Sequence, residues 1–383
     1  MDTELALSRV LDRVATTLDA TGVRFPYYAD TATGEWTTTG DGNWCGGHWV
    51  GLLLLAHAAT DESRFLHAAR RRAETVVASV EQASMFYGLN CHYAGFRAYD
   101  LTGEETFREY GLRGADATVE YFHQGARQVP LGTQPIDAPA SNFRGPDPED
   151  GSSGPSGDVL GAVDAIQTSL PVLWRAFHET GDPTYRDTAV SHADRHLDWY
   201  VRDDGRTWHH AEFDPASGDL LRQYNELAYS DETCWARGQG WCIAGLARAY
   251  AETGAGRYLD ALDATVDYYV SNTPDDLVPY WDFEHPDAPD VPRDTSSAAL
   301  VAYGLTQLPE DGATEPLRAT GESVLESIVA DYLTPTDGTD RRPPGMVTDG
   351  CYNGPASFAV SNELVWTDYY VGSALARRAG VLD

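Results

Sequence analysis

One short pattern, repeated four times, most constrains the fold of this chain. In each copy a threonine is followed by Gly or Asp, and a Tyr or Phe a few residues later opens a new apolar stripe. Gly suits the left-handed residue that closes a helix, and Asp, Glu or Pro after it suits the first turn of the next helix. The pattern therefore predicts hairpins of two helices, with turns at Thr60, Thr102, Thr180 and Thr253.

Long stretches with apolar residues at three- and four-residue spacing connect these turns, as expected for helices that bury one face. The clearest are residues 65–80, 107–122, 185–200 and 236–250. The turns are unequally spaced, which indicates loops of different length on a regular scaffold. Such loops favour a closed ring of helices with a site at one end over an open solenoid. We expect an all-α fold that forms a single domain over residues 1–383.

The predicted loops indicate at which end of the fold the site lies. Residues 124–157 are rich in Gly, Pro, Ser and Asp, and a loop of that length in a compact protein is usually functional or disordered. We expect it to form a lid or rim over the site, at the end shared by shorter loops at 280–293 and 334–362. Strands should be few, with one small hairpin near 207–224.

The charge of the chain is extreme. Asp and Glu number 59 against 27 basic residues, the net charge is −32, and there is no lysine. Because the acids are dispersed, they indicate adaptation to high salt, where screening makes dense carboxylates tolerable. A surface of this kind argues against binding nucleic acid or an anionic membrane.

Other features point to a cytoplasmic protein. The first residues form an amphipathic pattern with acids from the second position, unlike a signal peptide. The longest apolar stretch, residues 50–59, is too short to span a bilayer. The five cysteines form no CxxC pair, which argues against a zinc finger or a disulfide framework. We expect a monomer or a homodimer.

Two motifs rich in Trp and Gly stand at predicted helix starts. Residues 43–49 (NWCGGHW) contain Trp44, and residues 234–241 (CWARGQGW) contain Arg237 and Trp241. Aromatic faces stack on sugar rings, and Arg holds a carboxylate through two hydrogen bonds. The motifs therefore predict a site for an acidic sugar, the alternative being that the Trp side chains only fill a wide barrel.

Asp164 lies in an apolar run that we expect to be helical. A buried carboxylate is costly unless it is paired, hydrogen-bonded or used, and burial would raise its pKa into a range useful for acid–base catalysis. The alternative is a structural or capping Asp. His209 and His210 stand near Glu212 and Asp214, but adjacent residues of an extended segment point to opposite faces and no HExxH spacing exists, so we expect no metal site.

These residues resemble the unsaturated glucuronyl hydrolases and the related unsaturated rhamnogalacturonyl hydrolases over roughly residues 24–375. The most specific stretches are residues 44–49, 92–96, 170–185, 208–215, 235–241, 280–284, 293–297 and 366–370. The resemblance implies an (α/α)6 barrel of six helical hairpins. It also implies hydration of the C4=C5 double bond that a polysaccharide lyase leaves on the uronic acid at the non-reducing end of an oligosaccharide.

In this family an Asp donates a proton to the alkene and helps to activate water, and no metal or organic cofactor is implied. The resemblance places Trp44, His209, Arg237 and Trp241 in the site. We assign Asp164 as proton donor and His209 as a second catalytic residue that orients or contacts water, with Arg237 as clamp for the substrate carboxylate. We assign His92 and Tyr93 to substrate binding with Trp44 and Trp241.

The chain departs from the family at three positions. The family motif His-Asp-x-Gly-Phe reads HYAGF here, with Tyr93 in place of the acid. The place of the catalytic Asp is taken by Ala165, so that a one-residue bulge is needed to bring Asp164 into it. A substrate-binding Gln is replaced by Leu227, with Asn225 and Glu226 nearby.

Two other kinds of function stay open on the sequence alone. An inverting glycosidase needs two carboxylates about 6.5–9.5 Å apart, for which Asp164 could pair with Glu226, Asp231 or Asp282. An epimerase on the same barrel would use histidines such as His92, His209 and His210. A sugar-binding relative without catalytic activity is the remaining alternative.

Overall fold

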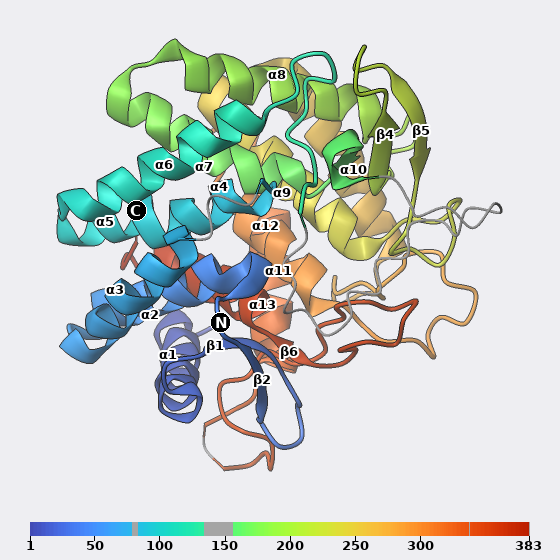
Figure 1. Ribbon diagram of the computed structural model, residues 1–383. Coiled ribbons are helices and arrows are strands. Elements are labelled where there is room, and N and C mark those ends of the chain that lie inside the picture. Colours follow the sequence, from blue (N-terminus) through green and yellow to red (C-terminus); the bar gives the residue numbers. More distant parts are fainter. Residues whose placement is uncertain (79–82, 134–155, 337, 383) are drawn as a thin grey trace.

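The computed structural model describes residues 1–78, 83–133, 156–336 and 338–382, and within them an inner ring of helices is wrapped by an outer one (Figure 1). The inner ring consists of α2 (Gly46–Thr60), the continuous segment α4 (Phe86–Cys91), η3 (His92–Phe96) and α5 (Arg97–Thr102), then α7 (Ala165–Thr180), α9 (Ala236–Thr253), α11 (Thr295–Leu305) and α13 (Val365–Arg378). Each member packs against the next, and α13 packs against α2, which closes the ring.

The outer helices each follow or precede an inner partner. They are α3 (Ser63–Ala78), α6 (Glu105–Tyr121), α8 (Pro183–Trp199), α10 (Gly256–Asn272), α12 (Glu315–Ser327) with the π-helical turn η5 (Ile328–Tyr332), and α1 (Thr3–Thr21). In the described part of the chain this gives six hairpins, the last of which joins α13 to α1. The predicted all-α (α/α)6 barrel is confirmed.

Inner and outer helices differ in burial for a reason visible in their sequences. Every residue of α11 is buried, as is the whole of α2 from Gly46 to Ala56. A helix that is apolar on all sides is stable only when it is covered on all sides. The outer helices bury one stripe and leave most of their charged residues outside it, as in α6. Arg72 of α3 is a buried exception.

The four predicted turns are confirmed, and the threonine has a defined part in each. Helices α2, α5, α7 and α9 end at Thr60, Thr102, Thr180 and Thr253. Each Thr hydroxyl donates to the carbonyl four residues earlier at 2.6–2.8 Å and accepts from the backbone N–H two residues later at 3.1–3.3 Å. The side chain thereby satisfies a carbonyl at the end of one helix and a donor at the start of the next.

Two glycines offer a test of these turns. Gly181 follows α7 with φ +73°, and a Cβ there would meet no atom within 4 Å, so a substitution is opposed by backbone conformation alone. We expect Gly181→Ala to lower the free energy of unfolding by about 1 kcal/mol. Gly256 begins α10 without a positive φ and also in open space, so we expect Gly256→Ala to raise it by about 0.5 kcal/mol. Urea unfolding of both variants measures the difference, and equal effects would contradict this explanation.

Short strands lead into the inner helices. One antiparallel sheet has the order β2–β1–β6, from Trp36–Thr39, Phe25–Ala29 and Glu363–Leu364. The other has the order β3–β4–β5, from Leu160–Ala162, His210–Phe213 and Leu220–Tyr224. The predicted hairpin near 207–224 is therefore confirmed, and β4 and β5 lie on the right in Figure 1.

The predicted loop at 124–157 lies mostly outside the described residues, since 134–155 are not among them. Its two described ends are tied together. Leu131 N–H donates to the Leu160 carbonyl at 2.7 Å, and Gly132 N–H donates to the Gly157 carbonyl at 3.0 Å.

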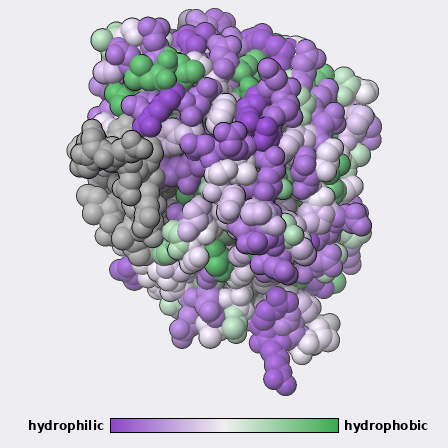
Figure 2. Space-filling model, turned by 90° about the vertical axis from the view of Figure 1, so that its right-hand side faces the viewer, coloured by the Kyte–Doolittle hydropathy of each residue, from purple (hydrophilic) through white to green (hydrophobic). Residues whose placement is uncertain are grey.

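The face seen in Figure 2 is largely hydrophilic, with small scattered hydrophobic patches, as expected from the dispersed acids. No helix within the described ranges has the length and apolar character needed to cross a bilayer.

Candidate active site at the N-terminal ends of the inner helices

The first residues of several inner helices meet at one end of the ring. Trp44 in the 3-10 turn η1 (Asn43–Cys45) contacts Trp366 of α13, with ring centroids 4.7 Å apart. Arg237 in the first turn of α9 donates to the Ser296 hydroxyl of α11 at 3.4 Å. Helix N-termini present free N–H groups and partial positive charge, so their convergence favours an anionic ligand.

Asp164 lies at this end, directly before α7. The prediction that it belongs to a helical run is wrong, because α7 begins at Ala165 and Asp164 ends the turn that follows β3. The bulge considered for this position is absent from α7, and the π-helical turn in the inner ring is η3 instead. The side chain makes no capping bond, is 9% exposed, and leaves Oδ1 without a hydrogen-bond partner.

The surroundings of Asp164 act on its pKa in opposite directions. Burial is the larger effect and raises the pKa to about 6, whereas the charges of Arg237 and His210 lower it. A carboxyl with a pKa near neutrality can both give up and take back a proton at moderate pH. The unpartnered oxygen leaves it free to do so toward a ligand.

Arg237 is fixed by hydrogen bonds and by a buried ion pair. It donates to the carbonyls of Cys351 and Tyr352, the latter at 2.6 Å, and its Nη1 lies 3.7 Å from Oδ2 of the fully buried Asp294. Several N–H groups of Arg237 therefore hold the segment around 351–352. The sequence predicted Arg237 as a clamp for the substrate carboxylate and did not indicate this structural role. Its positive charge still faces Asp164.

An aromatic wall stands beside this arginine. The guanidinium lies over the rings of Trp235, Tyr352 and Trp366 at 4.7, 5.5 and 5.8 Å. The rings of Trp44 and Tyr352 are inclined by 29° with centroids 6.4 Å apart, and Trp44 Nε1 donates to the Tyr27 hydroxyl at 3.2 Å. Flat aromatic faces beside a cation suit an acidic sugar ring.

The glycine pair after Trp44 serves packing. A Cβ on Gly47 would lie 2.7 Å from Cα of Asn90 in α4, and the Gly47 N–H donates to Oδ1 of Asn90 at 2.8 Å. Gly47 therefore allows a close approach between two inner helices, α2 and α4.

His209 and His210 are arranged differently from the prediction. Their rings stack with centroids 3.6 Å apart, because His209 precedes strand β4 and its N–H donates to Oδ1 of Asn225 at 2.7 Å. Burial and the charges of His210 and Arg237 hold the pKa of His209 well below its usual range. His209 is thus a neutral imidazole, and its Nδ1 has no hydrogen-bond partner.

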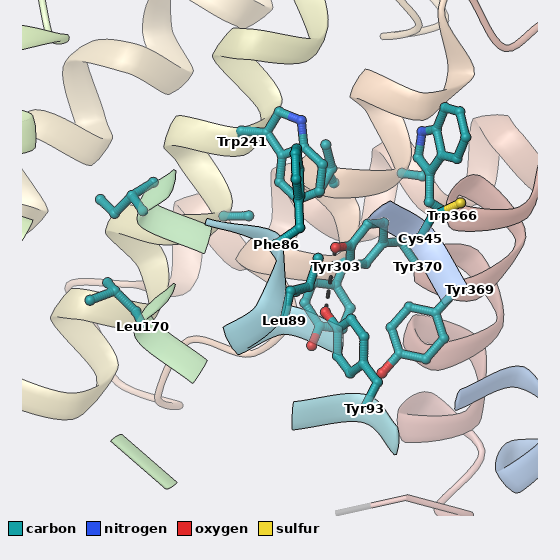
Figure 3. Close-up of a cluster of buried hydrophobic side chains, with 14 of the residues drawn as sticks. Cys45, Phe86, Leu89, Tyr93, Leu170, Trp241, Tyr303, Trp366, Tyr369 and Tyr370 are labelled. Carbon is teal, nitrogen blue, oxygen red and sulfur yellow. Dashed lines mark hydrogen bonds between the residues drawn. The ribbon is translucent and has the colours of Figure 1, made fainter. Parts of the chain in front are cut away.

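Tyr93 and Trp241 belong to the cluster of buried side chains drawn in Figure 3. They are 0% and 1% exposed, and the Tyr93 hydroxyl donates to that of Tyr370 at 3.4 Å, drawn as a dashed line in Figure 3. Tyr370 also lies 3.1 Å from Nε2 of His48. Where the family has an acid, this chain thus has a buried tyrosine in a neutral hydrogen-bonded chain.

His92 contacts the rings of Tyr93 and Phe96. Burial, followed by the charges of Arg97, Arg248 and Arg175, holds its pKa well below the usual range. Arg97 lines a separate pocket of about 360 Å³ between α2, α5 and α13, which contains no residue of the predicted site. The structure therefore links Trp44 to Arg237 through Trp366, and places Asp164 and His209 within the influence of the Arg237 charge. Tyr93 and Trp241 both contact Tyr370.

Several residues of this end were not predicted as site residues. Tyr352 comes from the loop at 334–362, and Trp281 comes from the loop at 280–293. The Trp281 carbonyl accepts from Ala236 N–H at 3.0 Å. Both loops were placed at the site end, and these contacts confirm it. Within the described ranges, no group of three or more His, Cys, Asp and Glu side chains is arranged to hold a metal ion.

A closed ring of helical hairpins with a free acid, an arginine and an aromatic wall at one end defines a carbohydrate-active (α/α)6 enzyme. The sequence model of Glycosyl Hydrolase Family 88 matches residues 23–315, and the chain belongs to this family. It is therefore a glycoside hydrolase by family.

Curated relatives and solved structures agree with this. The chain is 28% identical to the unsaturated glucuronyl hydrolase of Bacillus sp. (strain GL1), over 97% of this chain and 95% of that protein. It is 26% identical to the unsaturated chondroitin disaccharide hydrolase of Streptococcus pneumoniae, over 97% and 90% of the two chains. The crystal structure of the Bacillus sp. GL1 enzyme superposes with a TM-score of 0.84 at 25% identity, covering 98% of this chain and 96% of that one.

Proposed function

We propose that this chain hydrates the C4=C5 double bond of an unsaturated uronic acid at the non-reducing end of a lyase-generated oligosaccharide. Family membership and the activities named for its relatives support the reaction. The single observation that carries it is Asp164, a buried carboxyl with a free oxygen beside the Arg237 cation. A neutral His209 completes the set of polar groups.

The chemistry assigned to each residue follows from its protonation state. Protonated Asp164 gives its proton to C4 of the alkene, and water adds its oxygen to C5 while its proton returns to the carboxylate. The hemiketal so formed opens and releases the rest of the sugar. Arg237 and the helix N-termini favour the substrate carboxylate, and neutral His209 orients the water.

The ring of the substrate needs a flat apolar partner, which Trp44 and Tyr352 supply. Tyr93 and Trp241 contact Tyr370, and their part in substrate binding stays a prediction. A part for His92 in substrate binding stays a prediction.

An inverting glycosidase is less well supported, because its candidate bases are engaged by the chain itself. Oε2 of Glu226 lies 3.1 Å from Nε2 of His210, and Oδ1 of Asp231 accepts from Asn225 N–H at 2.8 Å. Asp282 accepts from Tyr229 N–H and from the Thr233 hydroxyl. An epimerase that uses His92 with His209 is opposed by their separate surroundings.

The reaction is tested by the loss of alkene absorbance in the ultraviolet, with unsaturated disaccharides prepared by lyases from several uronic polysaccharides. The assay is run in concentrated KCl, since the acidic, lysine-free surface predicts salt adaptation. Loss of absorbance in proportion to protein concentration is the expected result. Folded protein that leaves every substrate unchanged would refute the proposal. A single domain, a cytoplasmic location and a monomeric or homodimeric state stay predictions.

A further inference from the structure

A buried pair of side chains stands behind Asp164. Nε2 of His210 lies 3.1 Å from Oε2 of Glu226, and Nδ1 of His210 lies 3.3 Å from the Gly161 carbonyl. The His210 and Glu226 side chains are 1% and 7% exposed. Neither residue has a part in the proposed proton transfer or in substrate binding.

The partners of His210 define its protonation. A carbonyl oxygen and a carboxylate oxygen both accept hydrogen bonds and cannot donate them. With Glu226 ionised, each ring nitrogen of His210 carries a proton, and His210 is then an imidazolium paired with the Glu226 carboxylate. The stacked neighbour His209 is neutral, so adjacent histidines hold different protonation states.

The charged and titratable groups around these residues come from several elements. Three such groups lie around His210. They are Asp164 in the turn before α7, Tyr224 of β5 with ring centroids 5.2 Å apart, and the adjacent His209. Asp164 is further surrounded by Arg237 from α9, Tyr200 after α8 and Tyr370 from α13. Glu226 is in direct contact with His210, and this contact connects it to the surroundings of Asp164.

We propose that Glu226 and His210 are positioning residues that keep a fixed cation beside Asp164. The cation stabilises the Asp164 carboxylate once its proton has moved to the substrate, and it sets the pH at which Asp164 stops acting as a donor. This inference rests on the proposed function for its consequence in catalysis, although the charge pair itself does not.

Glu226→Gln is the direct test, because an amide can donate to Nε2 and so permits a neutral His210. Without the cation the Asp164 carboxyl holds its proton more tightly, since an opposite charge nearby lowers a carboxyl pKa. We expect the alkaline limb of the kcat/KM profile to move up by about one pH unit, with KM little changed.

Glu212→Gln is the matched control. Glu212 lies two residues from His210 on β4 but pairs with Arg222 at 2.5 Å on the surface, so its loss removes the same charge without touching His210. A similar shift in this control, or no shift in Glu226→Gln, would overturn the proposal. His210→Gln removes the cation by a second route and should give the same direction of shift if Glu226→Gln folds poorly.

A measurement without substrate separates this inference from the proposed reaction. The titration of the Asp164 carboxyl is followed by carbon-13 NMR of Asp-labelled protein, assigned by difference from Asp164→Asn. A higher titration midpoint in Glu226→Gln supports the pair even if no substrate is turned over, which would refute only the reaction. An unchanged midpoint refutes the pair even in a fully active enzyme.

Discussion

Asp164→Asn is expected to lower kcat/KM on the unsaturated substrate by about 10³-fold, because the amide cannot supply the proton that the alkene requires. The wild-type enzyme should in turn lose activity as the pH rises through about 6, where burial places the pKa of this carboxyl. The measurement is the ultraviolet assay in concentrated KCl. Near-full activity in the variant would remove Asp164 from the mechanism.

The same substitution should not destabilise the fold. The pKa of Asp164 is raised from 3.8 to about 6 on folding, so the folded state holds this proton more tightly than the unfolded chain. Its contribution to stability is therefore present below about pH 4 and is lost as the pH rises to about 6. Asn does not ionise, so we expect the Tm of the variant at pH 7 to equal or exceed that of the wild type.

Asp182→Asn serves as the control for this experiment. Asp182 caps α8 at the far end of the α7–α8 hairpin, where its side chain accepts from Thr184 N–H at 2.9 Å. Asn is an equally good N-cap, so activity and Tm should both stay near the wild-type values. A loss of activity here would show that the assay responds to carboxylates far from the site.

Arg237→Met is expected to have the largest effect on stability. It removes the cation 3.7 Å from Asp294, which is fully buried, and the donors that hold the carbonyls of Cys351 and Tyr352. Breaking one side of a buried ion pair costs about 3–5 kcal/mol, so the free energy of unfolding in urea should fall by that amount. Activity should fall as well, since the aromatic wall loses its support.

A double substitution distinguishes the two losses. Arg237→Met with Asp294→Asn leaves no unpaired buried charge, so part of the stability should return while activity stays lost. Arg237→Lys keeps the charge but not the planar fork, and should lie between wild type and Arg237→Met in stability. If Arg237→Met were as stable as the wild type, the ion pair of Arg237 with Asp294 would not stabilise the fold.

The helical ring could be predicted because its signals are local. A Thr followed by Gly181 or Gly254 defines its turn through hydrogen bonds within five residues, whatever the rest of the chain does. The site was predicted in part for the same reason, since Trp44 and Arg237 stand in motifs at helix starts. Asp164 was found because a carboxyl in an apolar run needs an explanation.

The remaining features depend on contacts between distant segments. The stacking of His209 on His210 depends on where β4 begins. The partner of His210 is Glu226, which lies sixteen residues further along the chain, after β5. The carbonyls that Arg237 binds lie more than a hundred residues away in sequence. Composition and periodicity carry no information on such pairs.

The closure of the ring has a consequence for how the protein is made. The hairpin partner of α1 is α13, and Arg13 of α1 pairs with the buried Glu363 just before α13. During synthesis α1 leaves the ribosome before α13 and must wait for that helix. Trp366, half of the contact with Trp44, arrives with that same helix. The contact between Trp44 and Trp366 therefore cannot form until α13 has been made. Pairing of such distant segments makes folding slow.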